Sequence, residues 1–262
     1  MNILDKIVTQ KQKEVAERKE LYPTLLLEKS TFFNSKTVSL SHYIKREDKS
    51  GIIAEFKRKS PSKPDINLFA NVEEVSIAYM QGGASALSIL TDSTFFGGKS
   101  EDLTAARKYN FCPILRKDFI IDEYQVIEAR SIGADAILLI AEILTTEQVK
   151  QLSSLAHSLG MEVLLEIHRE SQLEKYDNNI KLIGVNNRDL DTFKTDVNFS
   201  KQLIDKLPQN VTKVSESGIH DAHVVKELRA CGYDGFLIGE RFMVNAHPGE
   251  ACKSFIQEIA QA

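Results

Sequence analysis

Tryptophan is absent from the 262-residue chain, cysteine occurs only three times, and long uncharged hydrophobic runs are missing. The longest apolar stretches, such as residues 136–141, stop at flanking acidic residues after six positions. A helix that spans a bilayer needs about 20 apolar residues. The sequence therefore predicts no membrane partner.

A basic excess is also absent, because 33 basic residues are set against 37 acidic ones, for a formal net charge of -4. Both signs are spread along the chain, whereas a nucleic-acid-binding protein gathers basic residues on one face. We therefore expect no nucleic-acid partner. The first 18 residues carry charges throughout and lack the apolar region of a secretory signal, so a cytoplasmic location is expected.

The cysteines, Cys112, Cys231 and Cys252, are odd in number and widely spaced. This pattern fits neither a disulfide framework nor a CxxC site for metal or redox chemistry. We expect three buried, reduced thiols and no metal centre.

Eight short apolar runs of strand length alternate with segments of helix-like spacing, which indicates parallel strands joined by crossover helices. Most runs are continuously apolar, as strands covered on both faces are. The eight runs are residues 52–56, 86–90, 112–115, 136–140, 163–165, 182–185, 211–214 and 235–238. Length alone allows one domain or two. Eight units of roughly 27 residues favour a single (β/α)8 TIM barrel of class α/β over an open doubly wound sheet.

The first 45 residues contain no clear strand-like run, but Ile3, Ile7, Val15 and a cluster at residues 25–27 suggest helices. We therefore divide the chain into an N-terminal helical extension, residues 1–45, packed on a catalytic barrel, residues 46–262.

Charged side chains follow at least six of the eight runs, and in a barrel the C-terminal ends of the strands form the active site. Glu55 and Lys57 share one face of the first strand, as do Asn186 and Arg188 of the sixth if the extended backbone continues. For a single strand, simple exposure explains such residues equally well. Convergence of six strand ends on one rim favours a binding site.

The loops after the seventh and eighth runs hold Ser217-Gly218 and Gly239-Glu240. Barrels often bind phosphate there, through backbone N–H groups and a short helix. A lone glycine is more typical of a tight turn. Two glycines at the two expected loops favour a phosphate site.

Six blocks in register give the chain a family resemblance. They are EFKRKSPSK (55–63), LRKDF (115–119), LEIH (165–168), VNNRDL (185–190), SESGI (215–219) and FLIGE (236–240). With these blocks and its N-terminal extension, the chain resembles indole-3-glycerol phosphate synthase. The resemblance implies a barrel enzyme of tryptophan biosynthesis, a carbon–carbon lyase. It would convert 1-(2-carboxyphenylamino)-1-deoxyribulose 5-phosphate to indole-3-glycerol phosphate with loss of CO2 and water, without metal or organic cofactor.

Ring closure develops charge on a carbonyl oxygen, which a lysine can stabilise by donating a proton or by its charge. The resemblance implies that Lys117 is the general acid and Glu166 the base of the later dehydration. Lys57 would lie by the substrate carboxylate as a second acid or a positioning cation. How these three residues divide the proton transfers is left open. Neighbouring opposite charges are expected to keep both partners ionised, while burial can bring a lysine pKa down toward the working pH.

The same resemblance assigns supporting roles around these three residues. Glu55 would orient a lysine, Asn186 and Glu216 would contact the substrate or its hydroxyl groups, and Arg188 would brace the network. Phe119 would pack on the anthranilate ring. The residues implied in ribulose and phosphate contacts are Ser60, Ser217, Gly218, Gly239 and Glu240, the last through its backbone N–H.

Pro64 stands where the family usually has glycine, so the loop after the first strand should be stiffer, which bears on the rate of loop closure more than on the identity of the reaction. His168 shares a strand face with Glu166, and a structural or rim role is favoured over an acid–base role. Phe95 and Phe96 either wall the aromatic pocket or pack within their loop.

Two alternatives to this function remain from the sequence. One is a Schiff-base lyase or aldolase on the same barrel, with Lys117 as nucleophile. The other is a catalytically inactive phosphate-binding scaffold, which the joint presence of Lys57, Lys117 and Glu166 disfavours. The expected partner is the phosphorylated anthranilate–ribulose substrate, whose two anionic groups require a local positive excess at the rim. A monomer is expected, and association with other tryptophan-pathway enzymes is left open.

Overall fold

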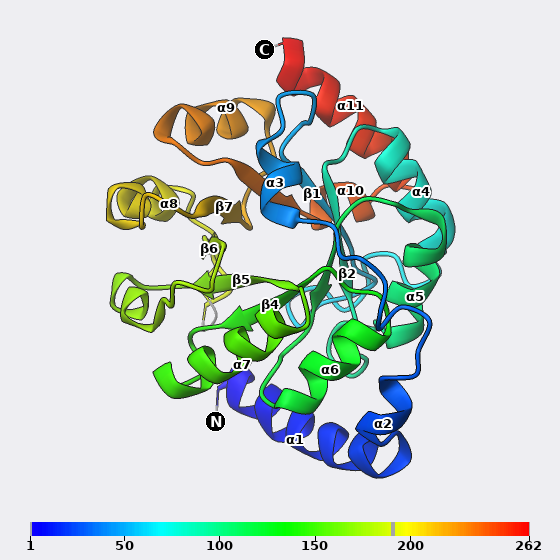
Figure 1. The fold of residues 1–262 in the computed structure, drawn as a ribbon. Coiled ribbons are helices and arrows are strands. Elements are labelled where there is room, and N and C mark those ends of the chain that lie inside the picture. Colours follow the sequence, from blue (N-terminus) through cyan, green and yellow to red (C-terminus); the bar gives the residue numbers. More distant parts are fainter. Residues whose placement is uncertain (1, 190–191, 262) are drawn as a thin grey trace.

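The computed structural model describes residues 2–189 and 192–261, and its eight parallel strands close into a barrel in chain order (Figure 1). The strands are β1 (Ile52–Phe56), β2 (Ala86–Leu90), β3 (Ile114–Lys117), β4 (Ala136–Ile140), β5 (Glu162–Ile167), β6 (Leu182–Asn186), β7 (Thr212–Glu216) and β8 (Gly235–Ile238). β1 pairs with both β2 and β8, which closes the ring. The predicted (β/α)8 barrel is confirmed.

Several strands run further toward their C-terminal ends than the apolar runs do. β3 ends at Lys117, β5 at Ile167 and β7 at Glu216. Pairing with neighbours explains this: Leu90 is aligned with Lys117, and Asn186 with Glu216. The polar residues at the strand ends are therefore held by the barrel rather than by loops.

Helices surround the barrel in the order expected for crossover connections, with one exception. They are α4 (Val72–Gln81), α5 (Ser100–Tyr109), α6 (Glu123–Ser131), α7 (Thr146–Ser158), α8 (Asn198–Leu203), α9 (Ala222–Cys231), α10 (Glu240–Met243) and α11 (Pro248–Gln261). Between β5 and β6 the described chain has only a 3-10 helix, η1 (Glu170–Lys175), and a second one, η2 (Ile204–Lys206), follows α8.

The core has two layers because successive strand side chains point to opposite faces. Ile52, Ala54 and Phe56 of β1 join the outer layer beneath the helices. The inner layer fills the barrel and includes Ile53, Leu115, Leu164 and Val214. No helix among the described residues is long and apolar enough to cross a membrane.

Three helices precede the barrel: α1 (Ile3–Leu21), α2 (Thr24–Leu27) and α3 (Leu40–Lys45). α3 packs at the N-terminal ends of the strands, where Ile44 is so near Gly235 that a Cβ there would lie 2.9 Å from it. α1 lies beside α6, as the blue helix of Figure 1 shows, and its Leu4 and Ile7 enter the inner layer. These contacts place helices at both ends of the barrel.

Cys112 and Cys252 are buried, and burial raises the pKa of each thiol to about 12. Cys231 is exposed, so the prediction of three buried thiols is wrong at this position. Cys231 is the last residue of α9, whose buried side chains are Ala222, Val225 and Leu228. Position 231 thus falls at the solvated end of an amphipathic helix.

Candidate active site

One lysine and three carboxylates form a layer across the barrel, one from each odd-numbered strand. Glu55 lies on β1, Lys117 on β3, Glu166 on β5 and Glu216 on β7. Each follows an inner-layer residue by two positions, so each points inward. Side chains from alternate strands share a layer in a (β/α)8 barrel, which explains why these four meet.

The ammonium of Lys117 lies at the centre of this charged layer. Its Nζ is 2.9 Å from Glu216 Oε2, 3.3 Å from Glu166 Oε2 and 4.0 Å from Glu55 Oε2. Lys57 Nζ is 3.1 Å from the other oxygen of Glu55. Glu55, Glu166 and Glu216 are buried. With Lys57, the four groups of the layer form a set of five ionisable groups that influence one another's protonation.

Two glycines make room for the carboxylates. A Cβ on Gly184 of β6 would lie 2.1 Å from Glu216 Oε1, and one on Gly239 would lie 2.8 Å from Glu55 Oε1. Gly239 was expected only as a phosphate-loop residue, and Gly184 was not singled out. A glycine inside a strand often marks a close approach, which was the available signal for Gly184.

Burial and the local charges move the pKa values in different directions. Burial alone would lower the pKa of Lys117, but Glu216, Glu166 and Glu55 raise it well above its ordinary value. Burial raises the pKa of Glu216 to about 7 despite Lys117, and Glu166 and Glu55 contribute in the same direction. Of the two opposing effects expected on a lysine pKa, the neighbouring carboxylates outweigh burial at Lys117.

Glu55 and Glu166 differ from Glu216 because cations outweigh burial. Burial would raise the pKa of Glu55, but Lys57 and Lys117 bring it below its ordinary value. The pKa of Glu166 is also lowered, since Lys117, His168 and Asn186 together oppose its burial. At neutral pH these two carboxyls are ionised, whereas Glu216 is near its titration point.

A cavity of about 170 Å³ opens above the charged layer. All thirteen residues expected at the site line it: Glu55, Lys57, Ser60, Lys117, Phe119, Glu166, Asn186, Arg188, Glu216, Ser217, Gly218, Gly239 and Glu240. The sequence reasoning missed Ile3, Leu4 and Ile7 of α1, which also line it. Their helical spacing was visible, and the family resemblance implied N-terminal helices near the active-site face, but neither pointed to these three residues as part of the cavity.

The cavity wall is apolar on the side of β2, β3 and β4. Phe96 and Phe119 contact each other there, with ring centroids 5.8 Å apart, and Leu138 and Ile140 continue the surface. Of the two readings for Phe96, the structure supports the one in which it walls the pocket. This side can accept an aromatic ring.

The opposite side carries the two loops expected to bind phosphate. Ser217 and Gly218 follow β7 with positive φ values of 67° and 73°. A serine in that region is uncommon and marks a turn that the surrounding structure enforces. Arg241 lines the cavity beside Gly239 and donates a hydrogen bond to His220 O.

The side chain of Glu240 connects two cations at the rim. Its Oε1 is 3.5 Å from Lys63 Nζ and its Oε2 is 3.6 Å from Arg188 Nη2. Arg188 also donates a hydrogen bond of 3.3 Å to Ser62 Oγ. The loop after β1, which includes Pro64, is thereby tied to the loops after β6 and β8. Leu190, in the VNNRDL block, lies outside the described residues.

His168 follows β5, and its Nε2 lies 3.3 Å from Glu166 Oε1. The ring is nearly buried and is not among the described residues that line the cavity. His168 therefore contacts Glu166 from outside the cavity. Among the described residues, no group of three or more histidine, cysteine, aspartate or glutamate side chains is arranged to hold a metal ion.

Comparison with known proteins gives a consistent result along the chain. A family model described as indole-3-glycerol phosphate synthase matches residues 4–255. The indole-3-glycerol phosphate synthase of Bacteroides thetaiotaomicron is 48% identical over 258 residues, covering 98% of this chain and 99% of the relative. The indole-3-glycerol phosphate synthase 2 of Ralstonia nicotianae is 43% identical over 266 residues, covering 100% and 98%.

The fold also has relatives among solved structures. The 3-hexulose-6-phosphate synthase from Salmonella typhimurium matches with a TM-score of 0.63 at 12% sequence identity, covering 80% of this chain and 98% of that one. At this identity the likeness shows the barrel fold alone.

Proposed function

The chain belongs to the indole-3-glycerol phosphate synthase family, and from that premise we propose how its residues carry out the reaction. The enzyme is a lyase of tryptophan biosynthesis that forms indole-3-glycerol phosphate by decarboxylating ring closure. The single observation that carries the proposed roles is Lys117 among three carboxylates on the floor of the cavity.

The two sides of the cavity support one orientation of the substrate. Its anthranilate ring would lie against Phe96 and Phe119, and its phosphate would lie at the loops of Ser217-Gly218 and Gly239-Glu240, on the far side. The ribulose carbonyl then falls between them, above Lys117. Lys57 would face the substrate carboxylate.

Ring closure joins the aromatic carbon that carries the carboxylate to the ribulose carbonyl carbon. Lys117, held protonated by its raised pKa, would donate a proton to the carbonyl oxygen as the bond forms. The carboxylate then leaves as CO2. In the dehydration, the new hydroxyl group leaves as water with a proton, and Glu166 would remove a proton from the carbon beside the ring nitrogen. Glu216, with a pKa near 7, could exchange a proton with Lys117 between steps.

The same electrostatics disfavour the Schiff-base alternative. A nucleophilic lysine must be neutral, which requires a lowered pKa. Lys117 has a raised one. Borohydride with substrate is expected to trap no lysine adduct.

The remaining proposals concern the working state of the protein. All thirteen residues assigned to the site line one cavity, so the proposed site is complete without a second copy and a monomer is the proposed working state. Substrate and product are phosphorylated metabolites, which supports a cytoplasmic location. Sedimentation at working concentration tests the first proposal.

The activity test uses the carboxyphenylamino ribulose phosphate and the absorbance and fluorescence of the indole product. The protein contains no tryptophan, so its own fluorescence does not obscure that signal. Lys117→Met is expected to lose about 100-fold or more in kcat. Lys181→Met, an exposed lysine before β6, is the control and should match the wild type. Folded wild-type protein that forms no indole would refute the proposed function.

A further inference from the structure

Lys11 of α1 is a buried lysine whose side chain reaches the C-terminal ends of β2 and β3. Its side chain is only 5% exposed, and its Nζ lies 2.8 Å from Glu14 Oε2, 2.9 Å from Asp92 Oδ2 and 3.0 Å from Asp118 Oδ1. Lysines are seldom buried unless they are paired. Burial would lower the pKa of Lys11, but Asp118 and Asp92 raise it above its ordinary value, so the ammonium stays charged.

The two aspartates anchor the aromatic wall of the cavity. Asp92 follows β2, and its Oδ1 accepts hydrogen bonds from the backbone N–H groups of Phe95 at 2.8 Å and Phe96 at 3.1 Å. Asp118 follows Lys117, and its Oδ1 accepts a 2.8 Å bond from the N–H of Phe119. Lys11 therefore joins the two loops whose aromatic rings meet in the cavity.

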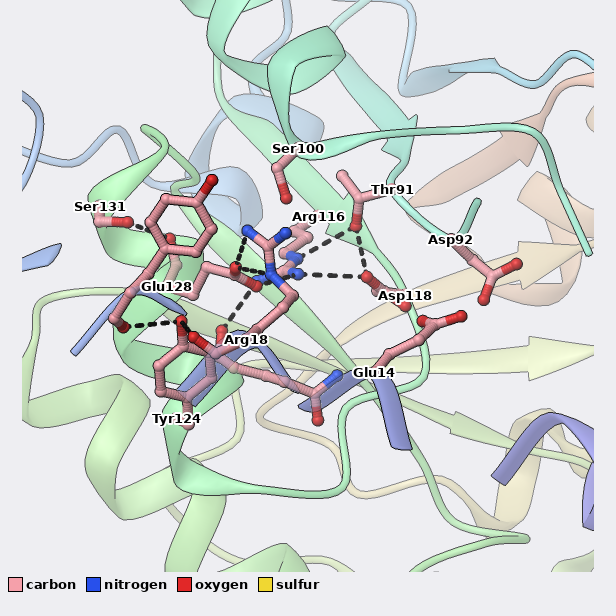
Figure 2. A network of polar contacts seen from close by, with 12 residues as sticks. Glu14, Arg18, Thr91, Asp92, Ser100, Arg116, Asp118, Tyr124, Glu128 and Ser131 are labelled. Carbon is pink, nitrogen blue, oxygen red and sulfur yellow. Dashed lines mark hydrogen bonds and ion pairs between the residues drawn. The ribbon is translucent and has the colours of Figure 1, made fainter. Parts of the chain in front are cut away.

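Asp118 also belongs to a second set of contacts, which Figure 2 shows. Its Oδ2 is 2.6 Å from Thr91 Oγ1 and 3.2 Å from Arg116 Nη2. Arg116 is 2.6 Å from Glu128, which also pairs with Arg18 of α1. Burial would raise the pKa of Asp118, but Lys11 and Arg116 bring it far below its ordinary value.

Asp92 has fewer partners than Asp118. Its side chain is fully buried, and in the described part of the chain Lys11 is the one cation paired with it. Without Lys11, Asp92 would be an uncompensated buried charge, which is strongly unfavourable. The carboxyl would have to rotate, take up a proton or admit water, and each change disturbs its bonds to Phe95 and Phe96.

We propose that Lys11 is a positioning residue of this enzyme. By bridging Asp92 and Asp118, it fixes the Phe96 and Phe119 wall and the adjacent end of β3, from which Lys117 projects. The N-terminal helix is then a working part of the active site. The expected change in kcat/KM rests on the proposed function, whereas the expected change in the structure of the two loops does not.

Lys11→Met tests the inference, with Lys13→Met, an exposed lysine of the same helix, as the matched control. Amide hydrogen exchange is expected to accelerate at Phe95, Phe96 and Phe119, and to stay unchanged along α11. The kcat/KM of Lys11→Met should fall at least 10-fold, and that of Lys13→Met should stay within twofold of the wild type.

The double variant Lys11→Met with Asp92→Asn separates positioning from charge compensation. It removes the uncompensated carboxylate and is expected to regain stability, while kcat/KM stays low because no cation bridges the loops. If Lys11→Met does not fold, the double variant is measured alone. Wild-type exchange and kinetics in Lys11→Met, or full recovery of kcat/KM in the double variant, would overturn the inference. An inactive wild type would count against the proposed function, and the exchange data would still decide the role of Lys11.

Discussion

Replacing Glu216 with glutamine should make the protein more stable at alkaline pH. Glu216 is buried beside Glu166 and Glu55, and its pKa is raised to about 7 in the folded protein. Glutamine keeps the shape of the protonated side chain and cannot ionise. The variant therefore isolates the free-energy cost of ionising Glu216 inside the barrel.

The size and sign of the effect follow from proton linkage. The ordinary pKa of a glutamate is 4.5, and the pKa of Glu216 in the folded protein is about 7. Between these two pH values the folded protein binds the proton of Glu216 more tightly than the unfolded chain does. The Glu216 contribution to the free energy of unfolding is therefore fully present below pH 4.5 and lost as pH rises through 7. The loss amounts to about 3 kcal/mol. Glu216→Gln should match the wild type near pH 4.5 and exceed its stability by about 3 kcal/mol at pH 8.5.

Glu55→Gln is the matched control from the same layer, and its effect should have the opposite sign. Burial would raise the pKa of Glu55, but Lys57 and Lys117 lower it on balance. Ionised Glu55 therefore stabilises the folded protein above its unfolded pKa, and glutamine should destabilise it at neutral pH.

Urea unfolding followed by far-ultraviolet circular dichroism, from pH 4.5 to 8.5, measures both variants. A stability gain for Glu216→Gln that does not grow between pH 5 and 8 would refute the reasoning. A loss of stability in Glu216→Gln as large as the loss in Glu55→Gln would also refute it. Activity should fall in Glu216→Gln even where stability rises, because glutamine cannot exchange a proton with Lys117.

Three further predictions concern single residues. Gly184→Ala places a Cβ 2.1 Å from Glu216 Oε1 and should cost about 1–3 kcal/mol of stability, measured by thermal unfolding, together with activity; a wild-type melting temperature would contradict the close approach. Pro64→Gly should lose less than about 1 kcal/mol of stability and raise kcat, and an unchanged kcat would show that the loop after β1 does not limit turnover. In the native protein, a thiol reagent at pH 8 should modify Cys231 alone, with the other two thiols reacting only after unfolding; rapid labelling of all three would contradict their burial.

The barrel was predictable because its strands are covered on both faces. Residues 136–140 are apolar at every position, and all five are buried in β4. The exception is the segment after β5, where a helix was expected and a 3-10 helix forms. Spacing of apolar residues shows that a connection exists but does not determine its helix type. Packing against neighbouring elements decides that.

The position of a candidate site residue was predictable where that residue belongs to one of the sequence blocks at the strand ends. Lys117, Glu166 and Glu216 stand in those blocks, and the closed barrel brings all three together. Contacts between residues that are far apart in the sequence could not be predicted. The sequence gives no sign that Lys11 meets Asp92, 81 positions away, or that Gly184 must leave space for Glu216. The direction of the Lys117 pKa is another such case, since it depends on how many carboxylates surround a buried amine.

Charge in the cavity is divided between floor and rim, which refines the expectation of a local positive excess. With Glu216 protonated, Glu55 and Glu166 balance Lys57 and Lys117 on the floor. The floor is then close to neutral and can bind a carbonyl without repelling it. Other cations, closer to the rim, are available to bind the carboxylate and the phosphate of the substrate. Lys63 and Arg188 both pair with Glu240 beside the loops proposed to bind phosphate, and Arg241 lines the cavity there. We therefore expect protonation of Glu216 to favour binding of an anionic substrate above this floor. The raised pKa of Glu216 would then serve substrate binding, in addition to any role in proton transfer.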